Sequence, residues 1–216
     1  MIYRSLAFIA MLSSLLLSGC ASFPQEEVAQ VQSMPNVSKY KNKPSVYVDF
    51  KFFRGNPGAA NALEVSSVKE THSENVKKIV TDTGLFSSVT LDEFKQKETD
   101  YTVSLHLYNH GDTGGAAVSG FITGFTFGII PGAATDNFTL MAKIVDRNNH
   151  IIASTKNKDA VTTWIGLWFI PAMGNTPEKA INATFENQIR SALKTMIMKG
   201  KYKYSFDTHA LYPYNA

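Results

Sequence analysis

An apolar run that ends at the only cysteine of the chain is the feature that most restricts its structure. Residues 1–19 carry a single charge, on Arg4, followed by an apolar core and the small residues Ser18 and Gly19, and Cys20 comes next. A basic start, a short apolar core and a small-residue exit are typical of a secretory signal peptide, which is removed from the mature protein. Because Cys20 is the only cysteine, an intramolecular disulfide is excluded, and a packed core must hold the fold together.

The residues next to the cysteine are more specific than the apolar run. The sequence Leu17-Ser18-Gly19-Cys20 resembles the lipobox of bacterial lipoproteins, in which cleavage before the cysteine is followed by diacylation of its thiol. The resemblance implies that acyl chains such as palmitate on Cys20 anchor the mature chain to a membrane, and stable anchoring takes more than one chain. Ala21 follows the cysteine in place of an aspartate, which by resemblance to Gram-negative lipoproteins implies the outer membrane and a domain facing the periplasm.

An uncleaved transmembrane anchor is the alternative interpretation of the same run, because no charge appears between Arg4 and Glu26. A spanning helix needs about 20 mostly apolar residues. Serines at several positions, Gly19 and Pro24 interrupt this run, so cleavage is favoured.

Charge and composition restrict the classes of partner. Without residues 1–19 the chain has 20 Lys and Arg against 18 Asp and Glu, a net charge of +2. Nucleic-acid binding usually shows a strong basic stripe, so we expect no nucleic-acid partner. With 44% hydrophobic and 18% charged residues, the composition is that of a globular domain.

The sequence divides into four parts. Residues 1–19 form the expected signal peptide, residues 20–44 a lipidated N-terminus and tether, residues 45–200 a folded domain, and residues 201–216 an irregular tail. Within the domain, apolar residues at alternate positions predict strands, and steps of three and four residues predict helices. The predicted strands are 45–53, 85–91, 101–109, 138–146 and 151–156, and the predicted helices are 61–83 and 177–199.

Helix ends and one turn can also be placed. Gly84 is expected to end the first helix, Thr176 to cap the second at its N-terminus and Gly200 to end it. Residues 146–149 form the turn between the last two strands. The order of elements predicts an α+β fold, with a mainly antiparallel sheet of about five strands and two helices packed on one face.

Two segments of the domain, residues 113–135 and 160–177, contain no charged side chain. The first has small residues at four-residue steps, which suit close helix packing as well as a tight apolar loop. The predicted strand order brings both segments to one end of the sheet. We hypothesise that they form an apolar pole that docks a partner or a membrane, with Phe121, Phe125, Phe127, Ile130, Trp164, Trp168 and Phe169 as its contact residues. The alternatives are that the segments only cap the core, or that they insert partly as a helical hairpin.

No catalytic motif stands out in the sequence. His106 and His110 are four residues apart on a strand, a spacing that does not bring them together. His110 beside Asp112 lacks the three or four convergent ligands that a metal needs, and His72 on the first helix is expected to be a packing residue. We therefore expect no enzyme, no metal site and no cofactor.

The mature chain resembles a broad group of envelope lipoproteins with a small α/β domain. The residues that carry the likeness are the lipobox, Leu85 to Val89 after the first helix, the strand opened by Asp100-Tyr101, and the hairpin from Phe138 to Ile152. A comparable order is found in the curli-secretion lipoprotein, in auxiliary lipoproteins of ABC-type lipid transporters and in the N-terminal domain of the Tol-system propeller protein.

The resemblance implies a non-enzymatic binding or assembly component of a cell-envelope complex, with a protein partner in the envelope. The alternative is a lipid-handling or transporter-accessory lipoprotein whose apolar pole contacts acyl chains. The sequence is also compatible with a homo-oligomer.

Overall fold

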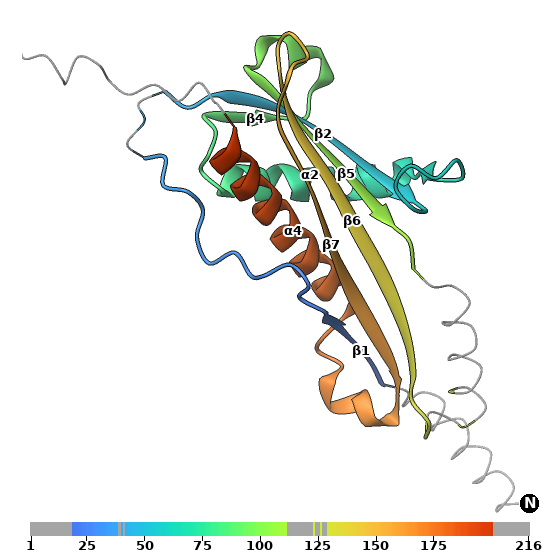
Figure 1. Cartoon of the computed structure of the whole chain (residues 1–216). Helices are drawn as coiled ribbons and strands as arrows, with labels where there is room; N and C mark the ends of the chain where they lie inside the picture. Colours follow the sequence, from blue (N-terminus) through green and yellow to red (C-terminus); the bar gives the residue numbers. More distant parts are fainter. Residues whose placement is uncertain are drawn as a thin grey trace, which may run out of the picture. The chain divides into compact units, whose positions relative to one another are not determined.

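The computed structural model describes residues 19–38, 40, 42–111, 123, 126 and 129–200 (Figure 1). The expected tail at 201–216 and all of the expected signal peptide except Gly19 lie outside these residues. The elements in chain order are β1 (Gly19–Pro24), β2 (Ser45–Arg54), β3 (Leu63–Glu64), α2 (Ser66–Asp82), β4 (Ser88–Thr90), the 3-10 helix η1 (Glu93–Glu98), β5 (Tyr101–Asn109), β6 (Gly132–Asp146), β7 (Ile151–Gly166), the 3-10 helix η2 (Leu167–Ala172) and α4 (Pro177–Lys199).

The strands of this described part form one seven-stranded sheet in the order β1-β7-β6-β5-β2-β3, with β4 also paired to β2. β1 runs antiparallel to β7 and β2 antiparallel to β3, whereas β2 runs parallel to both β4 and β5. The prediction of a mainly antiparallel sheet of about five strands with two helices is therefore wrong. The sheet is mixed, and two 3-10 helices accompany the two α-helices among the described residues.

The parallel pairs arise from the connections between strands. Two parallel neighbours need a crossover, because the chain must return to the end at which it started. Helix α2 supplies this return between β2 and β4, and η1 supplies it between β4 and β5. The predicted strand over 85–91 is observed only at the three residues of β4. At its C-terminal end the chain turns into η1, where Asp92 caps the 3-10 helix by accepting a hydrogen bond from the Phe94 N–H at 3.0 Å.

Both strands of the last hairpin are longer than predicted. β6 begins at Gly132 instead of residue 138, and β7 continues to Gly166 instead of ending near residue 156. The turn between them agrees with the prediction, since Asn149 has a left-handed φ of 61° and the Asp146 side chain accepts hydrogen bonds from the Asn148 and His150 N–H groups at 2.8 and 2.9 Å.

Helix ends follow the expected signals more closely. Helix α2 begins at Ser66 rather than at residue 61, and its end is followed by Gly84 with a φ of 66°. Helix α4 has the predicted bounds, with the Thr176 hydroxyl accepting a hydrogen bond from the Lys179 N–H at 3.3 Å. The Gly200 N–H then donates to the Met196 carbonyl at 2.9 Å, and the predicted cap and stop are confirmed.

The described residues fall into two compact units. Among the described residues, unit 1 comprises 19–27, 110–111, 123, 126, 129–138 and 159–185, and unit 2 comprises 28–38, 40, 42–109, 139–158 and 186–200. The core of unit 2 lies between α2 and the sheet (Figure 1). Its fully buried members alternate along β2 and β5 and recur on α2 at helical spacing, and they include Val46, Val48, Phe50, Val103, Leu105, Val76 and Val80.

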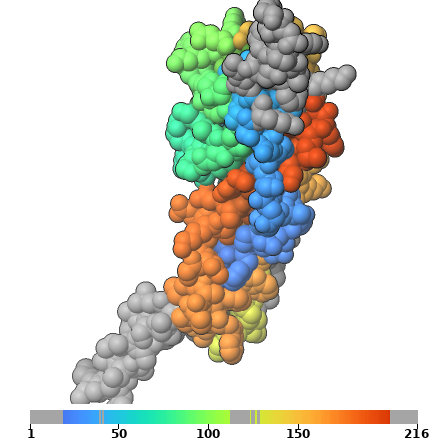
Figure 2. Space-filling view, turned by 90° about the vertical axis from the view of Figure 1, so that its left-hand side faces the viewer, coloured from blue at the N-terminus to red at the C-terminus, as the bar shows by residue number. Residues whose placement is uncertain are grey.

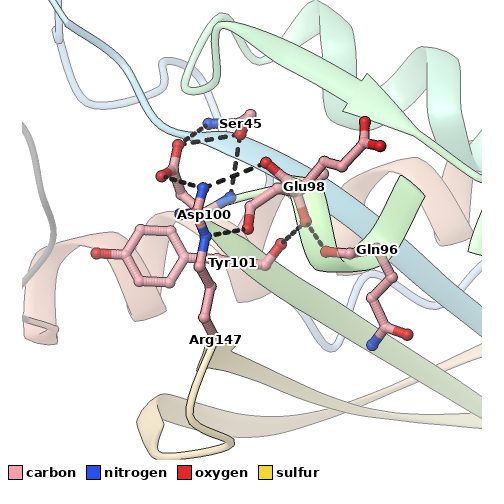
Figure 3. A network of polar contacts seen from close by, with 7 residues as sticks. Ser45, Gln96, Glu98, Asp100, Tyr101 and Arg147 are labelled. Atoms are coloured by element: carbon pink, nitrogen blue, oxygen red, sulfur yellow. Dashed lines mark hydrogen bonds and ion pairs between the residues drawn. The ribbon is translucent and has the colours of Figure 1, made fainter. Parts of the chain in front are cut away.

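A polar network in unit 2 fixes the start of β2 to the β6–β7 turn (Figure 3). The Asp100 carboxylate accepts hydrogen bonds from the Ser45 N–H at 2.9 Å and from the Ser45 hydroxyl at 3.0 Å. The Arg147 guanidinium donates to the carbonyls of Thr99 at 2.8 Å and Glu98 at 3.2 Å. Arg147 also lies 3.2 Å from the Asp100 carboxylate, so one cation links three consecutive residues.

Candidate functional site

The region expected to be a tether begins with a strand. β1 pairs antiparallel with β7, from Gly19 opposite Gly166 to Pro24 opposite Val161, and Cys20 lies opposite Ile165. Ala21 and Ser22 are 0% and 1% exposed, so the strand is built into unit 1. The stretch predicted to separate the anchor from the domain therefore starts inside the sheet.

Hydrogen bonds hold β1 along both of its edges. On the β7 side, the hydroxyls of Ser22 and Thr163 are 2.7 Å apart, and the Gln25 amide donates to the Thr162 hydroxyl at 2.9 Å. On the other side, the Ser22 N–H donates to the Asn175 carbonyl at 2.8 Å. The chain after η2 thus covers the edge of β1 that β7 leaves open.

Gly19 lies directly against the backbone of η2. Figure 2 shows blue atoms of the N-terminal part beside the orange part of the chain. A Cβ atom on Gly19 would lie 2.4 Å from the backbone nitrogen of Ile170 and 2.6 Å from the carbonyl carbon of Phe169. Real Cβ atoms do not approach backbone this closely, so only glycine fits at this position of the folded chain.

A group of exposed apolar side chains surrounds this part of unit 1. Trp168 is the most exposed of them at 71%, and the others are between 36% and 63% exposed. We call this group the apolar surface, and it consists of Ile129, Ile130, Trp164, Ile165, Trp168 and Ile170. Trp164 and Ile165 are neighbours on β7 and point to opposite sides of the sheet, so apolar side chains are exposed on both of its faces here. Exposed apolar side chains that gather at one end of a sheet are candidates for contact with a partner or a membrane, so this surface is a candidate contact site.

The structure brings the described parts of the two uncharged segments together. The Trp168 indole N–H donates a hydrogen bond to the Ile129 carbonyl at 2.9 Å, which agrees with the expectation that both segments reach one end of the sheet. Trp164 stacks on Phe169 with ring centroids 5.6 Å apart. Of the predicted contact residues, Ile130, Trp164, Trp168 and Phe169 lie here, and Phe121, Phe125 and Phe127 lie outside the described residues.

A second candidate site was not predicted from the sequence. A cavity of about 370 Å³ opens on β5, β6 and β7 within unit 2, lined by Ser104, His106, Met141, Ala142, Lys143, Ser154, Thr155 and Lys156. Its lining contains two lysines and no carboxylate. The sequence signal was the polar residues at alternate positions of 101–109, but only strand pairing places them beside the two lysines.

An acidic group lies next to this cavity. The Asp49 carboxylate is 3.3 Å from the His106 ring nitrogen, and both side chains are about a quarter exposed. The hydrogen bond with His106 lowers the pKa of Asp49 below its ordinary value, and this effect outweighs the opposing effect of burial. Asp49 is therefore an ionised carboxylate that is already paired with a residue lining the cavity.

Other residues considered from the sequence do not assemble into a site in the described part of the chain. No group of three His, Cys, Asp or Glu side chains is close enough there to hold a metal ion. None of the helices described is both long enough and apolar enough to cross a membrane. Asp112, considered as a partner of His110, lies outside the described residues.

No protein-family model and no curated protein matches the chain. Among solved structures, it is similar to a PelC dodecamer from Paraburkholderia phytofirmans, with 10% identity, a TM-score of 0.36, and coverage of 86% of this chain and 99% of that one. A dodecamer of a PelC variant from the same organism matches with 11% identity and a TM-score of 0.36, covering 79% of this chain and 96% of that one. Because both TM-scores are low, neither the fold nor the assembly of PelC is transferred to this chain.

Proposed function

We propose that this chain is a lipoprotein anchored through Cys20 to the outer membrane, where it serves as a non-enzymatic binding component of a cell-envelope complex and faces the periplasm. The observation that carries the proposal is the position of the lipobox. Cleavage before Cys20 would make the acylated cysteine the first residue of the mature chain, and that residue is already part of β1. The folded domain would then be held at the membrane surface itself.

We assign the binding of a partner to the cavity on β5, β6 and β7. Lys143 and Lys156 are exposed, and Asp49, the nearby carboxylate described above, is already paired with His106. A positively charged surface with an apolar member, Met141, suits an acidic segment of a partner that also carries apolar side chains. The partner is therefore expected to be an acidic region of another envelope protein.

Metabolic labelling with radioactive palmitate tests the anchor. The native chain should incorporate label, and Cys20→Ala should lose it, because no other cysteine is present to be acylated. Persistent labelling of Cys20→Ala would overturn the anchor. A matched control is Ser22→Ala, which changes the same strand without touching the thiol.

Native mass spectrometry of the protein purified from membranes in mild detergent tests the binding role. A stoichiometric protein partner that is lost in Lys143→Glu supports the proposal. Phospholipid retained in place of a protein would instead favour the lipid-handling alternative. Recovery of the chain without any protein bound, from membranes in which it is fully acylated, would count against the binding role.

A further inference from the structure

We propose that the apolar surface of unit 1 lies in the interfacial region of the same bilayer that holds the acyl chains of Cys20. This inference rests on the proposed lipid anchor and adds a second attachment to it. The membrane contact would then consist of the lipidated cysteine together with side chains of β7 and η2 and those of Ile129 and Ile130.

The first reason is that no flexible chain separates the cysteine from the apolar surface. Cys20 is directly opposite Ile165, which is 37% exposed. In an antiparallel pair, residues directly opposite each other have Cβ atoms about 5 Å apart and point to the same side of the sheet. Acyl chains attached to Cys20 would therefore leave the protein beside Ile165. The bilayer that holds these chains must then lie close to the Ile165 side chain.

The second reason is the chemistry of the surface. Residues 160–177 carry no charge, so no ionised side chain of this segment would have to be desolvated at the membrane. Tryptophan is enriched at membrane–water interfaces because its ring is apolar at one end and polar at the other. Both tryptophans of the chain, Trp164 and Trp168, belong to this surface, with Trp164 on the side of the sheet opposite to its neighbour Ile165.

The third reason is that the polar atom of the most exposed ring is already paired. Trp168 is 71% exposed, yet its indole N–H donates to the Ile129 carbonyl at 2.9 Å. A polar group that enters an apolar medium without a partner is strongly disfavoured. Because this hydrogen bond is internal, the Trp168 ring can move from water into the acyl boundary without losing it.

Tryptophan fluorescence in proteoliposomes tests the inference without an added probe. The full chain, purified in its acylated form, is reconstituted into vesicles of phosphatidylcholine and into vesicles of phosphatidylcholine brominated along its acyl chains. Bromine quenches tryptophan emission only at short range, so we expect weaker emission in the brominated vesicles. In the brominated vesicles, Trp164→Phe, which retains Trp168, should lose more of its emission than Trp168→Phe, which retains Trp164. Bromine should reach Trp164 less, because this ring is 36% exposed and stacks on Phe169.

A matched control places the only tryptophan elsewhere in the same unit. Glu27 is exposed and follows the far end of β1, which extends about 13 Å from Cys20 to Pro24 at roughly 3.3 Å per residue. In the variant Trp164→Phe, Trp168→Phe, Glu27→Trp, emission should be the same in both kinds of vesicle. Circular dichroism checks that each variant is folded.

The outcomes separate this inference from the anchor. Quenching in the native chain and its absence in the Glu27→Trp control support the inference. Equal emission in both vesicles, from protein that floats with the vesicles and carries acyl chains, overturns the inference and leaves the anchor intact. Protein that carries no acyl chain and does not float overturns both.

Discussion

Cys20 and Ile165 lie opposite each other in the antiparallel pair of β1 and β7. This pairing places the predicted acylation site on the sheet of unit 1, beside the exposed side chains of the apolar surface. An anchor at the end of a flexible tether would let the domain move freely away from the membrane. An anchor on a paired strand restricts both the distance and the orientation of unit 1, which is the physical basis of the inferred bilayer contact.

Substitution of Gly19 distinguishes processed from unprocessed protein. A Cβ at this position would lie 2.4 Å from the Ile170 nitrogen, so Gly19→Ala should destabilise any folded chain that retains residue 19. In the processed protein residue 19 is absent, and the melting temperature should equal that of the native protein. The comparison is made by thermal unfolding of acylated Gly19→Ala.

The unprocessed reference for this prediction is Cys20→Ala, which cannot be acylated. Adding Gly19→Ala to it should lower the melting temperature, because the new methyl group must displace the backbone of η2. Alanine is small, so processing itself should be retained. A lowered melting temperature in the acylated single variant would contradict removal of residue 19.

Reversal of one charge at the cavity of unit 2 should weaken partner binding. Lys143→Glu replaces a cation by an anion, which should repel an acidic segment. The affinity for the partner should fall about tenfold, which corresponds to about 1.4 kcal/mol of binding free energy. The residue is exposed, so stability should stay within about 0.5 kcal/mol of the native value. Co-purification from membranes followed by quantitative mass spectrometry measures the loss. Lys95→Glu, an exposed lysine of η1 with the same change in charge, should retain the partner.

Asn187 should be important for the order of the segment after β1. Its side-chain amide donates to the Val28 carbonyl at 2.8 Å, and its oxygen accepts from the Val31 N–H at 3.0 Å. Asn187→Leu removes both bonds and leaves backbone groups without these partners, so it should destabilise the protein by about 2 kcal/mol. Chemical denaturation measures the change. Glu186→Leu, on the same helix and exposed, should have a much smaller effect, and equal effects of the two variants would refute this role.

The pair of Asp49 and His106 should make part of the stability depend on pH. The hydrogen bond with His106 holds the pKa of Asp49 below its ordinary value of 3.8. A depressed pKa in the folded state contributes stability above the ordinary pKa, and this contribution is lost as pH falls through the folded value.

Asp49→Asn should therefore be less stable than the native protein at pH 7, by about 0.5–1 kcal/mol because the pair is partly exposed to water. The difference should begin to narrow as pH falls below about 4, where Asp49 of the unfolded chain becomes protonated. It should vanish at still lower pH, once the folded carboxylate is protonated as well. Thermal unfolding at several pH values measures it. A difference that does not change with pH would show that packing, and not the charge, is responsible.

Local signals in the sequence predicted the parts of the fold that depend on a few neighbouring residues. Helix α4 has the predicted bounds, and Thr176, Gly84 and Gly200 have the predicted roles at helix ends, because each depends on one backbone turn. The strand at 101–109 was also predicted correctly from its alternation. Along α4, however, the buried face also includes the polar residues Asn187 and Gln188, whose side-chain NH2 groups donate to the Val28 carbonyl and to the Asn157 side-chain oxygen.

The direction of strands was not predictable in this way. β4 and β5 run parallel to β2 because α2 and η1 return the chain, and the six residues of η1 have no apolar period that would reveal them. A short edge strand that contains Ser22 and Pro24 has the composition of a linker, which is why the sequence predicts a tether at β1. Its position depends on pairing with residues more than 130 positions away, such as the Ser22 hydroxyl with that of Thr163.

The same distinction between local signals and long-range pairing applies to the candidate sites. The lipobox at Cys20 is a contiguous motif, and the two uncharged segments are contiguous runs, so the chain alone was enough to single them out. Whether an anchor is near an apolar side chain depends on contacts between residues distant in sequence, and the β1–β7 register decided that Cys20 faces Ile165. The hydrogen bond from Trp168 to Ile129 likewise joins two segments that no local pattern relates. A chemical motif such as the lipobox is encoded by a few consecutive residues. Whether two such motifs lie near each other in space depends on which strands pair, and only the tertiary structure decides that.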